Sequence, residues 1–442
     1  MKDTAYMHDE SARDGLPGGV DSATGEFERA VPSRPVHVSD IPGLTPSNDA
    51  PGAVQNGSPD IDFTLSRGSA QPAPEAIEPT KDLSQRVIAE LVELIAPDWQ
   101  RLDAVFAMTV SDEAAQIVVS DDRRTARVLP PAELVARLRE LRHLSAESGD
   151  GPWWRVLVSL SDAGDVQVDY DYGAEPFPDD QLLPPQAYLA DLQVYPRKRL
   201  PVWLAAYVGH NGSQGRSPRT AVAQVQADRA AEVQAAPVTK GLPPFPLLWA
   251  RWAVISAAFV AAKSPWGPRI TTALGWFEGS SRSGSTLHRF PGDRAVLSGG
   301  LWNAPELDAV YNDGAPMPSF YRGAPEWVAD PVVNPRAANG LLSFCFWWDG
   351  TGWHQGESPE VAGLGAALPG IWTSESSVDV IIRVLAASQR SAITELVAAA
   401  EAGTVTRSLL TRSLEGERVD VDSAYYQLMS AGVVAQAVRQ PL

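Results

Sequence analysis

The densest group of chemically capable side chains is a run of carboxylates in residues 162–180. Its seven acidic residues, with no Lys or Arg between them, are Asp162, Asp165, Asp169, Asp171, Glu175, Asp179 and Asp180. In an extended strand Asp169 and Asp171 lie on one face, about 6–7 Å apart, so they could in principle perform acid–base hydrolysis. Nothing nearby in sequence supplies the apolar surroundings that such a pair needs.

The same carboxylates fit two other readings. Exposed strand faces are commonly polar, so the run could simply be a solvated face. So many like charges also repel one another, and a basic partner would relieve that repulsion and be steered toward it. We therefore keep a solvated face and a docking surface as the two interpretations, and place both above hydrolysis.

Other catalytic residue types are scattered. The six histidines are not spaced to share a metal, and no catalytic or phosphate-binding motif stands in its required setting. Cys345 lies in an apolar run, which favours a buried structural thiol. His288, Asp293, Asp349 and His354 could form an enzyme site only by meeting in space. We therefore expect a protein that is not an enzyme and has no catalytic residue, metal site or cofactor.

Composition narrows the class of partner. The chain has 442 residues, a formal net charge of −18 and one cysteine. Such acidity argues against nucleic acid as a partner, because phosphates are neutralised by clustered Lys and Arg. One cysteine excludes an intramolecular disulfide framework. The first residues lack a basic region followed by an apolar one, so we expect no export signal and a cytoplasmic protein.

The negative charge is unevenly distributed. Residues 1–80 contain 13 acidic and 5 basic residues and 10 prolines, without a helical or strand period. This composition predicts a disordered acidic tail. Residues 85–208 contain 20 acidic and 12 basic residues, so little net charge is left for the rest.

Residues 81–208 predict one α+β domain with an antiparallel sheet. A capping box of Asp82 and Gln85 begins a helix with an apolar stripe from Leu83 to Ile95, and Pro97 ends it. The expected strands are 104–110, 115–119, 125–129, 153–161 and 166–172, with a helix from Pro131 and a closing apolar segment at 184–208. The order is αβββαββα. Within 166–172, Val168 and Tyr170 would face the helices and Asp169 the opposite side.

A polar linker is expected at 209–242, followed by a second α+β domain at 243–442 with a helical C-terminus. Its first segment, 246–262, has only about 11 uncharged residues after Arg251, too few to span a membrane, which predicts a buried helix. The other expected strands are 269–278, 285–290, 294–298 and 341–348, and the expected helices are 302–311, 377–401, 404–413 and 421–435. Both domains begin α-β-β-β-α, so duplication and independent origin stay open.

The αβββαββα order, with VDYDYGAEPFPDD on its last strand and PPQAYLADLQVYPRKRLPVWL in the closing segment, resembles the YezG-like antitoxins. These belong to the immunity proteins of bacterial polymorphic toxin systems, which include actinobacterial immunity factors against NAD-degrading toxins. The resemblance covers residues 85–208. It implies a non-enzymatic protein that binds a cognate secreted toxin domain, of nuclease or NAD-degrading class, and blocks its active site. By position it implies contacts from Asp169, Asp171, Glu175, Asp179 and Asp180.

The chain departs from that family in its tail and its second domain. Family members are usually single small domains, whereas ten of this chain's 14 tryptophans fall from Trp249 onward. Trp327 and Trp353 lie on turn-rich stretches and are candidates for a second exposed interface.

Three hypotheses follow. The leading one is an immunity or antitoxin-like inhibitor whose partner is a toxin domain encoded by a neighbouring gene, with no nucleic acid and no membrane as partner. The second is a cytoplasmic secretion chaperone or adaptor for an exported protein, which the tail and the aromatic second domain would suit. The third is an enzyme whose site assembles from distant residues.

Overall fold

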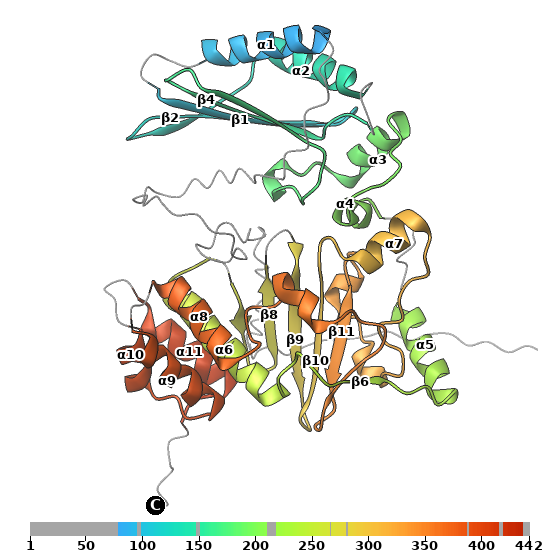
Figure 1. Ribbon diagram of the computed structural model, residues 1–442, viewed down its shortest axis with the longest axis vertical. Helices are drawn as coiled ribbons and strands as arrows, with labels where there is room; N and C mark the ends of the chain where they lie inside the picture. Colours follow the sequence, from blue (N-terminus) through green and yellow to red (C-terminus); the bar gives the residue numbers. More distant parts are fainter. Residues whose placement is uncertain are drawn as a thin grey trace, which may run out of the picture. The chain divides into compact units, whose positions relative to one another are not determined.

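The computed structural model describes residues 78–94, 99–146, 151–209, 218–265, 267–279, 282–386, 389–414 and 419–435 (Figure 1). The tail predicted for 1–80 lies almost wholly outside these ranges. The described residues form an α+β protein with two antiparallel sheets of five and seven strands, which confirms the predicted fold class.

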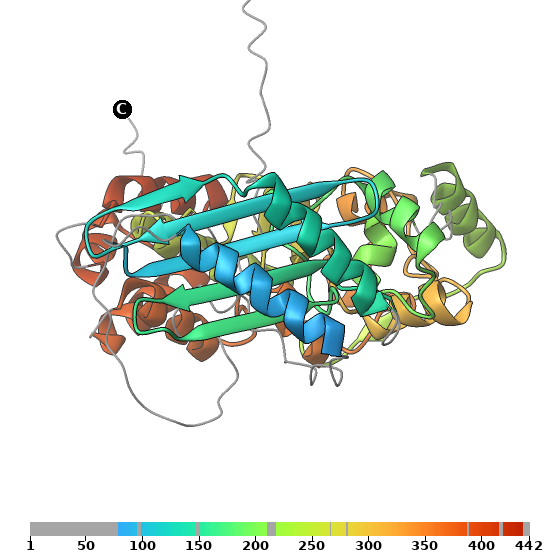
Figure 2. The ribbon, with the colours of Figure 1, turned by 90° about the horizontal axis from the view of Figure 1, so that it is seen from above.

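The five-stranded sheet has the order β3-β2-β1-β4-β5. Its elements are α1 (Glu78–Glu93), β1 (Arg101–Met108), β2 (Glu113–Ser120), β3 (Thr125–Val128), α2 (Ala132–Ser145), β4 (Arg155–Ser161), β5 (Val166–Asp171), α3 (Pro185–Val194) and α4 (Val202–Tyr207). The predicted order αβββαββα is present, and the closing segment is two short helices. Figure 2 shows α1 and α2 lying across one face of this sheet.

The core of the part of the chain built on the five-stranded sheet lies between that sheet and helices α1 and α2. Alternate β1 residues such as Leu102 and Phe106 are buried against the apolar stripe of α1 and α2. Val168 and Tyr170 of β5 pack on the same core, as the alternation predicts. The intervening carboxylates, including Asp169, therefore lie on the face without helices.

Helix α1 begins earlier than predicted. It starts at Glu78, so Asp82 is inside the helix and makes an ion pair with Arg86 at 2.6 Å instead of capping it. The expectation that Asp82 begins the helix is wrong, because a carboxylate four residues before an Arg also suits a helix interior. Ile95 and Pro97 lie outside the described residues.

The seven-stranded sheet has the order β6-β12-β11-β10-β9-β8-β7. Its elements are α5 (Pro218–Ala230), β6 (Ala236–Val238), α6 (Phe245–Ala261), β7 (Arg269–Ile270), β8 (Leu274–Glu278), β9 (Gly284–Phe290), β10 (Arg294–Gly300), α7 (Pro305–Asp313), β11 (Phe344–Trp348) and β12 (Trp353–Gln355). The segment predicted as a linker thus contributes α5 and β6. Strands β7 to β12 form a simple meander, whereas the first sheet places β4 beside β1, so the two topologies differ.

Helix α6 is the centre of the second core. Fourteen of its 17 residues are buried, and it packs against α8 (Ser374–Leu385), α9 (Arg390–Glu401) and α11 (Val421–Ala431). The prediction of a buried helix is confirmed. Within the described ranges, no helix combines the length and apolar character needed to cross a membrane.

The C-terminal helices differ from prediction at one point. The expected single helix 377–401 is two helices, α8 and α9, and α10 (Arg407–Ser413) precedes α11. Ala386 ends α8 with a left-handed φ of 48°, a conformation that favours glycine. No Gly or Pro in this stretch marks the break.

Candidate functional site

Strand β5 lies at an edge of its sheet and carries Asp169 and Asp171, which together with Asp165 just before the strand form an acidic row on one face. It pairs with β4 from Leu160↔Val166 to Arg155↔Asp171. In the described part of the chain no strand pairs with its other side. Asp169 and Asp171, two of the five carboxylates predicted as docking residues, therefore lie at an edge of the sheet.

The carboxylates of β5 have different surroundings. Asp169 is half-buried and accepts a hydrogen bond of 2.8 Å from Nε2 of Gln167. Asp171 accepts hydrogen bonds from Nε and a terminal nitrogen of Arg155. The Asp171 side chain is 22% exposed and that of Arg155 only 5%. Asp171 thus holds a buried cation, whereas Asp169 interacts only at the surface.

The segment after β5 turns back onto the helix-free face. Asp180, in a short 3₁₀ helix (Asp179–Gln181), accepts a hydrogen bond of 3.1 Å from Nε2 of Gln116 in β2. Asp179 makes an ion pair with Arg282 at 2.7 Å, and Glu175 is half-buried. Asp179 and Asp180 are therefore held by Arg282 and Gln116 of the same chain.

Arg155 connects β5 to the segment that follows it, and this residue was not identified as a candidate from the sequence. Its guanidinium also donates to the side chain of Gln181 and lies 4.3 Å from the ring centroid of Phe177. A buried cation is stable only when its donors are satisfied, and these contacts satisfy it. The available signal was one Arg at the start of an otherwise apolar strand, in WWRVLVSLS.

A second buried ion pair lies under α3. Arg142 of α2 donates to the backbone oxygen of Trp153 and to Asp191, both at 2.8 Å. The other oxygen of Asp191 accepts from the backbone of Val110 at 2.9 Å, and Asp191 is fully buried. This pair ties α2, α3 and the β1–β2 turn together, so its role is structural.

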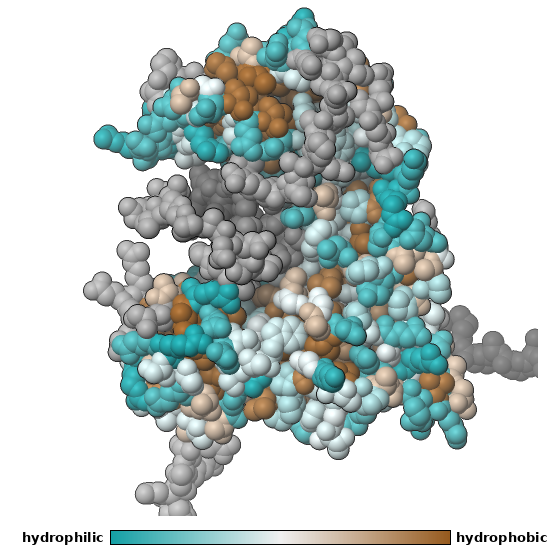
Figure 3. All heavy atoms as spheres, in the orientation of Figure 1, coloured by the Kyte–Doolittle hydropathy of each residue, from teal (hydrophilic) through white to brown (hydrophobic). Residues whose placement is uncertain are grey.

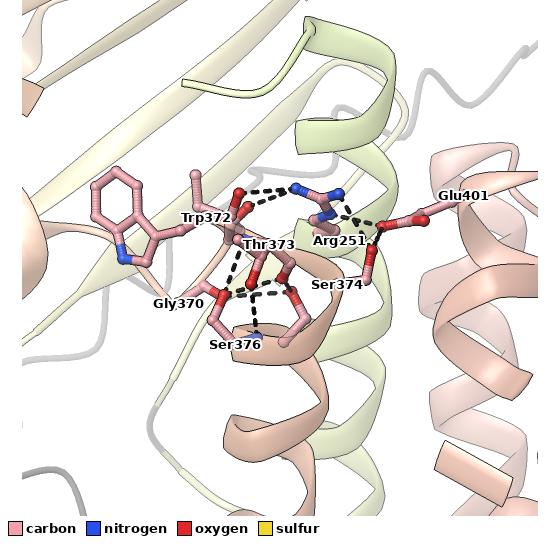
Figure 4. Close-up of polar contacts among 9 residues, drawn as sticks. Arg251, Gly370, Trp372, Thr373, Ser374, Ser376 and Glu401 are labelled. Carbon is pink, nitrogen blue, oxygen red and sulfur yellow. Dashed lines mark hydrogen bonds and ion pairs between the residues drawn. The ribbon is translucent and has the colours of Figure 1, made fainter. Parts of the chain in front are cut away.

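Figure 4 shows the corresponding cluster in the second body. Arg251 of α6 donates to Glu401 at 2.6 Å and to the backbone oxygen of Trp372 at 3.0 Å. Ser374 also donates to Glu401, at 2.7 Å. Beside it, Thr373 caps α8 in a capping box. The cluster joins α6, α8 and α9, and its polar groups are occupied with one another.

Only some of the four residues of the enzyme hypothesis lie close to one another. His354 lies 2.9 Å from Asp349, and Asp293 accepts from Nε1 of Trp348 at 3.3 Å. His288 occupies the same cross-strand row as His354 but three strands away, about 14 Å at ~4.8 Å per strand. Burial lowers the pKa of His288 to about 4, and nearby Asp330 opposes that shift.

Asp349 acts chiefly as a turn residue. Burial would raise the pKa of its carboxyl, but hydrogen bonds from the side chain and backbone of Thr351 and the backbone of Gly352 hold it well below the usual range. Cys345 is fully buried and burial raises the pKa of its thiol, as expected of a structural cysteine. Among the described residues, no three His, Cys, Asp or Glu side chains lie together in a way that could hold a metal ion.

The two candidate interface tryptophans are not equivalent. Trp353 is 3% exposed, and its Nε1 donates to the backbone oxygen of Pro243 at 2.7 Å. The expectation of an exposed Trp353 is wrong, because the short turn returns it directly into the ladder opposite Trp348. Trp327 is half-buried, with its ring 5.5 Å from that of Phe290.

Comparison with known proteins gives no assignment. Neither a scan against protein-family models nor a search of curated proteins finds a match for this chain. The resemblance to YezG-like antitoxins stays a prediction from residues 85–208.

Proposed function

We propose that this protein is a non-enzymatic inhibitor of the immunity or antitoxin type, which binds a cognate toxin domain of nuclease or NAD-degrading class. The observation that supports it is the place of the acidic row at the rim of the five-stranded sheet. Asp169 is a half-buried residue of β5, and the exposed Asp165 immediately precedes that strand. No described strand pairs with the outer side of β5. The kind of partner comes from the family resemblance.

Charge makes this proposal physically consistent. Nucleic acids and NAD both carry phosphates, so enzymes that cleave them need cationic groups in their substrate sites. An acidic surface on an inhibitor attracts those same groups and competes with the substrate. Long-range attraction of this kind accelerates association most strongly at low ionic strength.

The direct test uses the full chain and the toxin domain encoded beside it. Calorimetry should show a tight one-to-one complex whose affinity falls with added salt, and toxin activity should fall in proportion to complex formed. Absence of association at low salt would contradict the proposal. Association with a neighbouring exported protein that has no toxin domain would support the secretion-adaptor hypothesis instead.

A further inference from the structure

The outer side of β5 presents backbone groups that the described residues leave unpaired. The backbone N–H of Ser161 donates to the oxygen of Asp165 at 3.0 Å, which sets the phase of the β4–β5 ladder. The residues that bond to β4 are therefore Asp165, Gln167, Asp169 and Asp171. The residues whose N–H and C=O point away from β4 are Val166, Val168 and Tyr170. No described residue makes a backbone hydrogen bond to these three on that side.

The other sheet edges are protected in ways that β5 is not. Strand β3 has four residues, β7 has two, and β6 has three with Pro237 at its centre. Short strands and proline are the usual means of preventing edge-to-edge pairing. Strand β5 has six residues and no proline, so in the described part of the chain it is protected by its charged side chains alone.

Side chains on β5 divide into an apolar row and an acidic row. Val166 is 48% exposed on the helix side, where Val168 is partly buried. Figure 3 shows hydrophobic residues at the surface between α1 and the strands of this body. The opposite row consists of Gln167, Asp169 and Asp171. A strand added here would continue the apolar core on one side and meet carboxylates on the other.

We propose that the β5 edge binds an extended basic segment of the partner protein as a sixth strand, an inference that rests on the proposed function and specifies its binding mode. Main-chain hydrogen bonds to Val166, Val168 and Tyr170 would supply affinity. Specificity would come from side chains of the bound segment, in which Lys or Arg opposite Asp169 would alternate with apolar residues beside Val168. Asp171 contributes less, because Arg155 already neutralises it.

Charge also selects among the possible occupants. The chain's own residues 1–80 carry 13 acidic and 5 basic residues, so the acidic row disfavours them. A second copy pairing through β5 would bring two rows of carboxylates together, and like charges opposite one another destabilise a strand pair. A basic segment of another protein is the occupant that the row attracts.

The first test uses a synthetic probe and the full chain. The probe is a fluorescently labelled peptide, Lys-Val-Lys-Val-Lys-Val-Lys, and its controls are the Glu-Val counterpart and a shuffled peptide of the same composition. Fluorescence anisotropy at low salt should show binding of the alternating Lys peptide alone. Hydrogen exchange should slow in residues 166–171 upon binding. Equal binding of the shuffled peptide would overturn the strand-addition mode.

Two matched variants test the backbone and the charge separately. Val168→Pro removes one outward N–H without removing a bond to β4 and should weaken binding about tenfold, whereas Val168→Ala keeps that N–H and should change it less than about threefold. Asp169→Lys should reverse the preference and favour the Glu-Val peptide. Equal affinity of Val168→Pro and Val168→Ala, or an unchanged charge preference in Asp169→Lys, would refute the proposal.

The toxin domain separates this inference from the proposed function. If it binds wild type and Val168→Pro equally well, inhibition stands and strand addition is wrong. If the Lys peptide binds as described but no toxin domain does, strand addition stands and the inhibitor function is wrong.

Discussion

Arg155 and Asp171 lie opposite each other in β4 and β5, and the buried guanidinium donates two hydrogen bonds to the carboxylate. The same guanidinium holds Gln181 of the segment that follows β5. One member of the acidic row is therefore part of the internal scaffold, while Asp169, two residues earlier, makes only a surface contact. Identical residue types on one strand face thus have different roles.

This difference predicts different stability effects. Asp171→Asn should destabilise the β4–β5 region by about 2–3 kcal/mol, because it leaves the buried Arg155 charge without its counterion, and the partial exposure of Asp171 moderates the loss. Asp169→Asn, the matched control, should cost less than about 0.5 kcal/mol. Hydrogen exchange across residues 155–171 during urea titration measures both. Equal effects of the two substitutions would show that the Arg155 pair does not stabilise the strand.

The alternation of residue types made part of this region predictable. Val168 and Tyr170 alternate with carboxylates, and a strand period of two places them on opposite faces, as found. The burial of α6 followed from an apolar segment too short for a membrane. The pairing of Asp171 with Arg155 depends on strand register between separate segments, which no local pattern specifies.

Other features left no local signal at all. The left-handed Ala386 splits a continuous helical pattern without Gly or Pro, so tertiary packing decides the break. Strand β6 is three residues long and pairs with β12, more than a hundred residues away. Trp353 follows a polar turn, yet its ring is buried by the ladder it enters. Each of these depends on contacts between distant parts of the chain.

The Arg251 cluster predicts how the C-terminal helices depend on α6. Arg251→Met should destabilise α8 and α9 by about 3 kcal/mol or more, because it leaves the Glu401 carboxylate without its counterion and removes the hydrogen bond to the backbone oxygen of Trp372. Ser374→Ala removes one hydrogen bond to the same carboxylate and should cost about 1 kcal/mol. Hydrogen exchange of residues 374–401 measures both changes. A smaller loss for Arg251→Met than for Ser374→Ala would contradict a central role for the guanidinium.

His288 predicts a pH dependence of stability. Burial lowers its folded-state pKa from 6.5 to about 4, so the unfolded chain binds a proton more readily over that interval. Stability should therefore fall as pH drops from about 6.5 to about 4, by roughly 2 kcal/mol from this residue after allowance for its partial exposure. His288→Gln removes the titrating group. The Tm of the variant relative to that of wild type should therefore rise as the pH falls from about 7 to about 4.5. A difference in Tm that stays constant over this range would exclude His288 as a cause of the pH dependence.

Association kinetics test the acidic row as a steering surface. Asp171 is unsuitable for charge reversal, because its loss would also disturb Arg155, so Asp169→Lys is the informative variant. Glu140→Lys, at an exposed position on α2, makes the same change of charge on the helix layer. Stopped-flow mixing with the toxin domain at low salt should show an association rate about threefold to tenfold lower for Asp169→Lys, with a smaller change for Glu140→Lys. Added salt should reduce the difference between the variants, since screening acts on long-range attraction. If Asp169→Lys and Glu140→Lys slow association equally, the net charge of the protein alone attracts the partner, and the acidic row on β5 makes no specific contribution to the association rate.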